Sequence, residues 1–191
     1  MEVKIDKRYE LAVAPARAWA VLRDVKVVAG CMPGATITEQ VDDKHYKGSV
    51  KVKVGPANAS FAGDIEVLAL DEAAMKLQLL GKGSDRAGSS ASMDLTATVE
   101  PGDAAGAAVL AGQAKVTVNG KFAQFGARMM VPVSEMLLAQ FADNFRAATA
   151  TAASESSATP TVPAKPNEIS ALAVLWGLIK GWIAGLFAKR A

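Results

Sequence analysis

Residues 1–130 alternate between polar and apolar side chains with a period of two, and this pattern constrains the fold more than any other feature of the chain. A period of two places successive side chains on opposite faces of a β-strand. In KGSVKVKVGP the valines point to one face, and the lysines and Ser49 point to the other. The pattern recurs in residues 3–13 and in SFAGDIEVLAL, AMKLQLLG, SSASMDLTATVEP and VLAGQAKVTVNG. Short turns separate these segments, so the pattern predicts an antiparallel meander with one polar and one apolar face.

Two segments interrupt the alternation and carry helical signals instead. Pro15 stands at a favourable first helical position, and the helix that it predicts ends at Gly30. A second helix is predicted to begin near Pro132, where the apolar residues of PVSEMLLAQFADNFRAATA share one side of a helical wheel. The order of strand, short helices, meander and long C-terminal helix predicts an α+β fold. In this fold a curved antiparallel sheet wraps around the long helix.

The composition of the chain changes sharply near residue 150. Residues 149–167 are rich in Pro, Ser, Thr and Ala, so they bury too little apolar surface to offset the entropy cost of ordering. Residues 168–191 are the most apolar part of the chain. These boundaries predict a folded domain over 1–148, a flexible linker over 149–167 and a separate, membrane-directed amphipathic helix over 168–191.

The apolar tail predicts membrane binding through one face of its helix. Large side chains gather on one half of the helical wheel, and Trp176 and Trp182 suit the level of the lipid headgroups. Two alternatives remain: a transmembrane helix that packs through the double GxxxG motif of Gly177, Gly181 and Gly185, or a helix that docks on protein. The residues predicted to bind the membrane are Leu172, Leu175, Trp176, Ile179, Trp182, Ile183, Leu186 and Phe187.

Small side chains dominate the predicted strands, and aromatic residues make up only 6% of the chain. A curved sheet with few bulky residues to fill it leaves room for an internal apolar cavity. The alternative is that small side chains let the sheet and the helix approach each other closely. Phe122, Phe125, Met129 and Met130 stand between the last strand and the long helix. Such residues suit a soft apolar ligand or a partner surface, or they form a hydrophobic cap on the core.

Residues that could carry catalysis or bind a metal are scarce. The chain has one His and one Cys, which leaves no His/Cys metal cage and no internal disulfide. His45 is expected to be solvated beside a turn, and Cys31 is expected to be a packed, inert thiol. A hydrolase or cyclase would need an inward cluster of polar residues, which the alternation does not offer. The sequence therefore predicts a protein that is not an enzyme and that binds no metal.

Binding of nucleotides and nucleic acids is also excluded. The stretch GKGSDRAGSS is rich in Gly and Ser, but it lacks the spacing of a phosphate-binding loop and a following helix. The 21 Lys and Arg residues nearly balance the 19 Asp and Glu residues, which argues against a nucleic-acid partner. The N-terminal residues MEVKIDKRYELAV form no targeting signal, so the folded part is expected to stay in the cytoplasm.

Four blocks of sequence stand out: CMPGA at 31–35, KVKVGPANASFAG at 51–63, GKFAQFGARMM at 120–130 and QFADNF at 140–145. In this order and spacing they resemble the family of the carbon monoxide dehydrogenase G subunit, over about residues 1–148. The resemblance implies the START-like helix-grip fold of the SRPBCC superfamily. It also implies association with a molybdenum hydroxylase, chiefly aerobic carbon monoxide dehydrogenase, at the membrane; relatives accompany other hydroxylases as well. The family has no pattern of catalytic residues, so no catalytic role is implied.

The resemblance and the tail together predict a membrane-tethered accessory protein at the cytoplasmic face of the cell membrane. Its partner enzyme must pass electrons on, and membrane quinones are too apolar to leave the bilayer unaided. The cavity is therefore expected to bind a quinone (menaquinone or ubiquinone) without a covalent bond and to deliver it as electron acceptor. The alternative is a purely structural recruiter without a ligand. The residues expected to line the cavity are Trp19, Phe61, Leu79, Met93, Phe122, Phe125, Met129, Leu137 and Phe141.

Overall fold

The computed structural model describes residues 1–54 and 57–156. The elements in chain order are β1 (Glu2–Leu11), α1 (Pro15–Leu22), α2 (Val25–Cys31), β2 (Ala35–Gln40), β3 (His45–Val54), β4 (Ala57–Asp71), β5 (Lys76–Ser84), β6 (Ser90–Pro101), β7 (Ala108–Asn119), the short 3-10 helix η1 (Lys121–Phe125) and α3 (Gly126–Ser156). The strands form one antiparallel sheet in the order β1-β7-β6-β5-β4-β3-β2. The predicted antiparallel sheet and long C-terminal helix are confirmed. The predicted tail helix lies outside the described residues.

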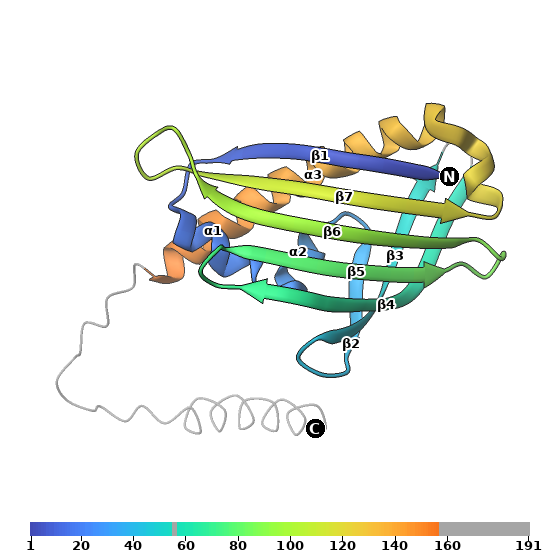
Figure 1. Cartoon of the computed structure of the whole chain (residues 1–191), viewed down its shortest axis with the longest axis horizontal. Helices are drawn as coiled ribbons and strands as arrows, with labels where there is room; N and C mark the ends of the chain where they lie inside the picture. Colours follow the sequence, from blue (N-terminus) through green and yellow to red (C-terminus); the bar gives the residue numbers. More distant parts are fainter. Residues whose placement is uncertain (55–56, 157–191) are drawn as a thin grey trace, which may run out of the picture. The chain divides into compact units, whose positions relative to one another are not determined.

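The sheet is strongly curved, and α3 lies along its concave face. Figure 1 shows β2 and β3 running steeply across the direction of β1, β5, β6 and β7, while β4 changes direction along its length. The short helices α1 and α2 pack against α3, and Asn144 Nδ2 donates a hydrogen bond to the Cys31 carbonyl at 2.9 Å. Sheet and helices therefore enclose a common interior.

The curvature depends on close backbone contact at the middle of β4. Gly63 pairs with Gly48 on β3 and with Gly83 on β5. A Cβ atom added to Gly63 would overlap the carbonyl oxygen of Lys82 and lie 2.5 Å from the Cα atom of Gly83. Only a residue without a side chain fits at this position, so the row of glycines lets two strands cross closely enough to bend the sheet.

The buried side chains form two clusters. The larger cluster joins α1, α2, the sheet and α3, and Phe145 of α3 is fully buried within it. The smaller cluster contains Ala59, Val118 and Phe122. Its aromatic rings are in contact, since the ring centroids of Phe61 and Phe122 lie 5.7 Å apart. Members of both clusters line the cavity described below.

The helices differ from the predicted bounds in three ways. The single helix predicted from Pro15 to Gly30 is two helices, because the Asp24 side chain accepts hydrogen bonds from the Lys26 and Val27 backbone N–H groups and starts α2 anew. The last helix begins at Gly126 rather than near Pro132, which lies inside it. This helix also continues to Ser156, past the change in composition near residue 150. Its Ala-rich end has high helix propensity, and Thr149 is 1% exposed.

Candidate ligand-binding cavity

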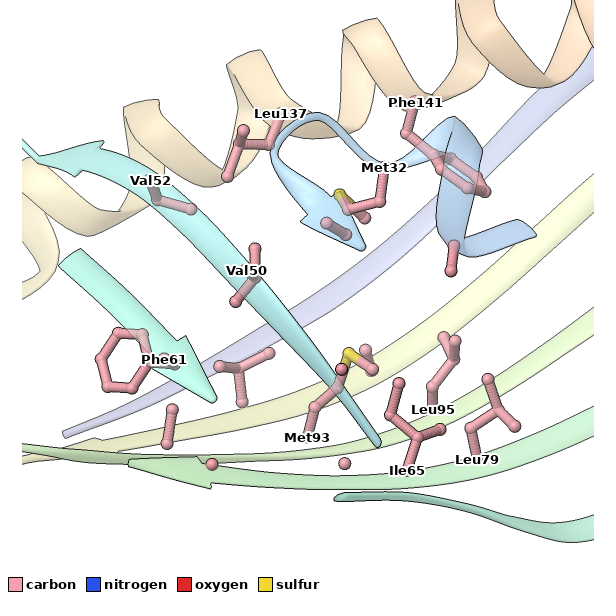
Figure 2. A pocket seen from close by; sticks show the side chains of 18 of the residues that line it. Met32, Val50, Val52, Phe61, Ile65, Leu79, Met93, Leu95, Leu137 and Phe141 are labelled. Carbon is pink, nitrogen blue, oxygen red and sulfur yellow. The ribbon is translucent and has the colours of Figure 1, made fainter. Parts of the chain in front are cut away.

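A cavity of about 440 Å³ lies between the concave face of the sheet and α3. Its lining surface is almost entirely apolar. Figure 2 shows Met93 and Leu95 from β6 and Leu137 and Phe141 from α3 pointing into the same space. Sites for small ligands and cofactors occupy about 300–1,000 Å³ and are mostly apolar, so this cavity has the size and the chemistry of such a site.

The cavity exists because glycines occupy inward positions of the strands. Gly81 and Gly83 of β5 and Gly112 of β7 all line it. A Cβ atom added to Gly112 would have no neighbouring atom within 4 Å. Of the two alternatives that the small side chains left open, the structure therefore contains the hollow interior rather than a fully closed contact between sheet and helix.

Six of the nine residues predicted to line the cavity do so: Phe61, Leu79, Met93, Phe122, Leu137 and Phe141. Phe125 does not line it but packs on the ring of Phe122, with 5.9 Å between the ring centroids. Met129 does not line it either, whereas its neighbour Met130 does. Because α3 already begins at Gly126, Met130, Val133, Leu137 and Phe141 share the face toward the sheet, and Met129 is rotated away from that face.

Trp19, the remaining predicted lining residue, instead ties α1 to the turn between β4 and β5. The residue is 5% exposed, and its Nε1 donates a hydrogen bond to Glu72 Oε2 at 2.7 Å. The other carboxylate oxygen of Glu72 lies 3.0 Å from a guanidinium nitrogen of Arg23. A buried indole needs a partner for its N–H group, and the turn supplies that partner here.

We expect Trp19→Phe to lower the free energy of unfolding by about 2 kcal/mol, because it removes a hydrogen bond to a charged group and some buried ring surface. Glu72→Gln keeps an oxygen acceptor at the same place and is expected to cost less. Urea unfolding followed by circular dichroism measures both values. If the two variants unfold at the same urea concentration as the unaltered chain, the hydrogen bond contributes nothing to stability.

One charged side chain that faces inward from the lining was not among the predicted residues. Lys7 lies on β1 between Ile5 and Tyr9, and all three residues line the cavity. The Lys7 ammonium group lies 3.4 Å from Glu135 Oε1 on α3. Strict alternation along β1 already places Lys7 on the same face as Ile5 and Tyr9, so the signal was present in the pattern. Asp64 and Lys82 also contribute to the lining, but both fall on exposed positions of their strands, β4 and β5.

The residues considered for catalysis are unremarkable in the structure. His45 is half-exposed, and its Nδ1 lies 2.9 Å from Asp42. Burial raises the pKa of the Cys31 thiol, so the reactive thiolate form is disfavoured. Within residues 1–54 and 57–156, no group of three or more His, Cys, Asp or Glu residues could hold a metal ion. In the same part of the chain, no helix is both long and apolar enough to cross a membrane.

A curved antiparallel sheet that encloses an apolar cavity with a long C-terminal helix defines the START-like helix-grip class, and solved structures agree. A conserved protein from Geobacillus kaustophilus matches with a TM-score of 0.69 and 19% identity, over 78% of this chain and 96% of its own. A START superfamily protein from Mycobacterium smegmatis matches with a TM-score of 0.57 and 12% identity, over 78% of this chain and 97% of its own. The Zhui aromatase/cyclase from Streptomyces sp. R1128 matches with a TM-score of 0.57 and 13% identity, over 83% of this chain and 98% of its own.

The sequence itself assigns the chain to a family within that class. The family model of CoxG, the G subunit of carbon monoxide dehydrogenase, matches residues 8–150, so the chain belongs to this family. CoxG proteins are accessory and not catalytic subunits, and the family implies association with a carbon monoxide dehydrogenase complex. A search of the curated proteins finds no match. The residues predicted to bind the membrane, in the segment 168–191, lie outside the described residues.

Proposed function

We propose that the protein is a membrane-tethered carrier, which takes a quinone from the bilayer into its cavity and presents it to a carbon monoxide dehydrogenase as electron acceptor. The single observation that carries this proposal is an apolar cavity of about 440 Å³ in an accessory subunit of a redox enzyme. A protein that only recruits its partner to a membrane has no need of such a hollow, since cavities lower stability.

The chemistry of the cavity suits a quinone ring and the first part of its hydrocarbon chain. Four aromatic residues, Tyr9, Phe61, Phe122 and Phe141, contribute to walls whose lining surface is almost entirely apolar. Transfer of apolar surface from water to such walls is favourable by about 25 cal/mol per Å². The cavity thus offers an apolar ligand surroundings like those of the bilayer interior. The ligand must leave that interior to reach the enzyme.

Electron delivery fits the reaction of the partner enzyme. Oxidation of carbon monoxide with water yields carbon dioxide, two protons and two electrons. One quinone takes up two electrons and two protons and becomes a quinol. In this scheme no group of this chain takes part in the redox step; the chain carries the acceptor and the reduced product between enzyme and bilayer.

The tether in this proposal is the apolar segment 168–191. Its large side chains, among them Leu172, Trp176 and Phe187, would hold the chain at the cytoplasmic face of the membrane. The preceding Pro- and Ala-rich residues would let the domain reach both the bilayer and the enzyme. Tethering matters because a carrier confined near the membrane meets its ligand and its partner at a raised effective concentration.

The experiment that tests the proposal is extraction of the purified, full-length protein with organic solvent, followed by mass spectrometry. After incubation with quinone-containing vesicles and re-isolation, we expect close to one quinone per chain. The background amount of quinone is measured by the same extraction of membranes from cells that lack the protein, after other proteins have been removed from these membranes. Protein that carries no quinone above this background, yet still binds its dehydrogenase to vesicles, is a recruiter and not a carrier.

A further inference from the structure

Two lysines of the described residues line the cavity: Lys7 on β1 faces inward, whereas Lys82 falls on an exposed position of β5. The burial pattern of β1 alternates, and Lys7 falls on the half-buried, inward positions together with Ile5 and Tyr9. Lys7 lines the cavity, although its side chain is still 42% exposed. An aliphatic residue would serve an apolar interior better, and the ammonium group of a lysine at this position needs a polar partner.

The present partner of Lys7 holds it only weakly. Glu135 approaches from α3 with 3.4 Å between its carboxylate oxygen and the ammonium nitrogen, and its side chain is 61% exposed. Exposed ion pairs of this kind contribute little to stability, because water screens them and two long side chains lose freedom. A ligand can therefore take over the ammonium group without breaking a strong contact of the fold.

The space next to Lys7 is open. Gly112 of β7 pairs with Lys7 across the sheet. A Cβ atom added to Gly112 would have no neighbouring atom within 4 Å. The neighbouring inward pairs on the same two strands, Ile5 with Ala114 and Tyr9 with Leu110, do carry side chains. The hollow therefore extends up to the lysine stem.

We infer that Lys7 selects the chemical class of the ligand, by donating a hydrogen bond to an acceptor oxygen at the end of an otherwise apolar molecule. The polar end of the ligand lies between β1 and α3, in place of Glu135, and the apolar part fills the cavity. A quinone carbonyl and a fatty-acid carboxylate share this chemistry, whereas a plain hydrocarbon lacks it. This inference rests on the proposed function and deepens it, since it names the residue that recognises the ligand.

The test compares two probes that differ only in their oxygens, 2,3-dimethyl-1,4-naphthoquinone and 2,3-dimethylnaphthalene. Equilibrium dialysis with the full-length chain in lipid nanodiscs gives the affinity of each, with empty nanodiscs as the background. The unaltered chain is expected to prefer the quinone by about tenfold, as befits one hydrogen bond from a charged donor. Lys7→Met is expected to lose that preference and keep its affinity for the hydrocarbon. Lys4→Met, on the exposed face of the same strand, is the matched control and is expected to keep the preference.

The outcomes separate the inference from the proposed function. If the unaltered chain binds neither probe, the cavity is not a ligand site and the proposed function fails. If Lys7→Met matches the unaltered chain in its affinity for the quinone, the hydrocarbon and laurate, the cavity binds ligands but Lys7 does not select them. Laurate, as a third probe, identifies the ligand group that Lys7 binds. If Lys7→Met loses affinity for the quinone, the lysine binds a carbonyl oxygen. If Lys7→Met loses affinity for laurate alone, the lysine binds a carboxylate.

Discussion

In the Gly112→Leu variant we expect the amount of bound quinone to fall at least tenfold, while the fold stays intact. A Cβ atom at this position meets no other atom within 4 Å, so the leucine side chain can enter only the cavity. The strand backbone is extended at Gly112 and accepts any residue. Filling a cavity with apolar atoms leaves stability unchanged or raises it, because new contacts form without loss of old ones. Solvent extraction and mass spectrometry measure the bound quinone, and thermal unfolding reports on the fold.

The matched control for this variant is Gln113→Leu. Gln113 is the next residue on β7 and points away from the cavity, toward Asp6 on β1. This control adds the same apolar side chain outside the cavity and is expected to keep its quinone. Electron transfer from the dehydrogenase to vesicles should stop with Gly112→Leu, whereas binding of the enzyme to vesicles should persist. Retention of quinone by Gly112→Leu at the ratio of the unaltered chain would place the ligand elsewhere.

Gly63→Ala is expected to lower the free energy of unfolding by about 3 kcal/mol, the largest effect on stability that we predict. The added Cβ atom would overlap the Lys82 carbonyl oxygen and approach the Gly83 Cα atom to 2.5 Å, so β4 and β5 must move apart where the sheet bends. Overpacking against backbone is costly because no side chain can rotate out of the way. The midpoint of urea unfolding, measured by circular dichroism, gives the value.

Gly81→Ala provides the comparison for Gly63→Ala. Gly81 also faces the interior, but the nearest atom to an added Cβ is the Met93 methyl carbon at 3.8 Å, an ordinary contact. We expect this variant to change the free energy of unfolding by about 1 kcal/mol or less. Equal urea midpoints for the two alanine variants would show that the close strand contact at Gly63 has no special cost to stability.

The strands could be predicted because each one is apolar on one face only, so that period-two alternation carries most of the information. The bounds of the helices were harder to predict, because they depend on single contacts. The hydrogen bonds of Asp24 divide the first helical segment, and η1 lets the last helix begin before Pro132. The predicted linker and tail beyond the described residues stay predictions.

The candidate site was harder to predict than the fold. Six lining residues followed from alternation and from the helical wheel, but Met129 was placed on the wrong face because the start of α3 sets its rotation. Trp19 was expected in the cavity, yet its N–H group donates a hydrogen bond to Glu72 in the turn between β4 and β5. Lys7 was not predicted, because a charged side chain is not expected on the wall of an apolar cavity. Curvature, and with it the depth of the cavity, arises from backbone contacts that no pattern of hydrophobicity records.

The position of β1 in the sheet has a consequence for how the protein is made. β1 pairs with β7, from Glu2 with Thr117 to Leu11 with Ala108, so β1 leaves the ribosome long before its pairing partner and must wait for it. Pairing between distant segments is slow compared with the formation of hairpins and helices. α3 is synthesised later still, and until it docks, the apolar face of the meander is open to its surroundings. A nascent chain thus needs protection from aggregation until α3 docks, and a ligand that enters before then can assist this step of folding.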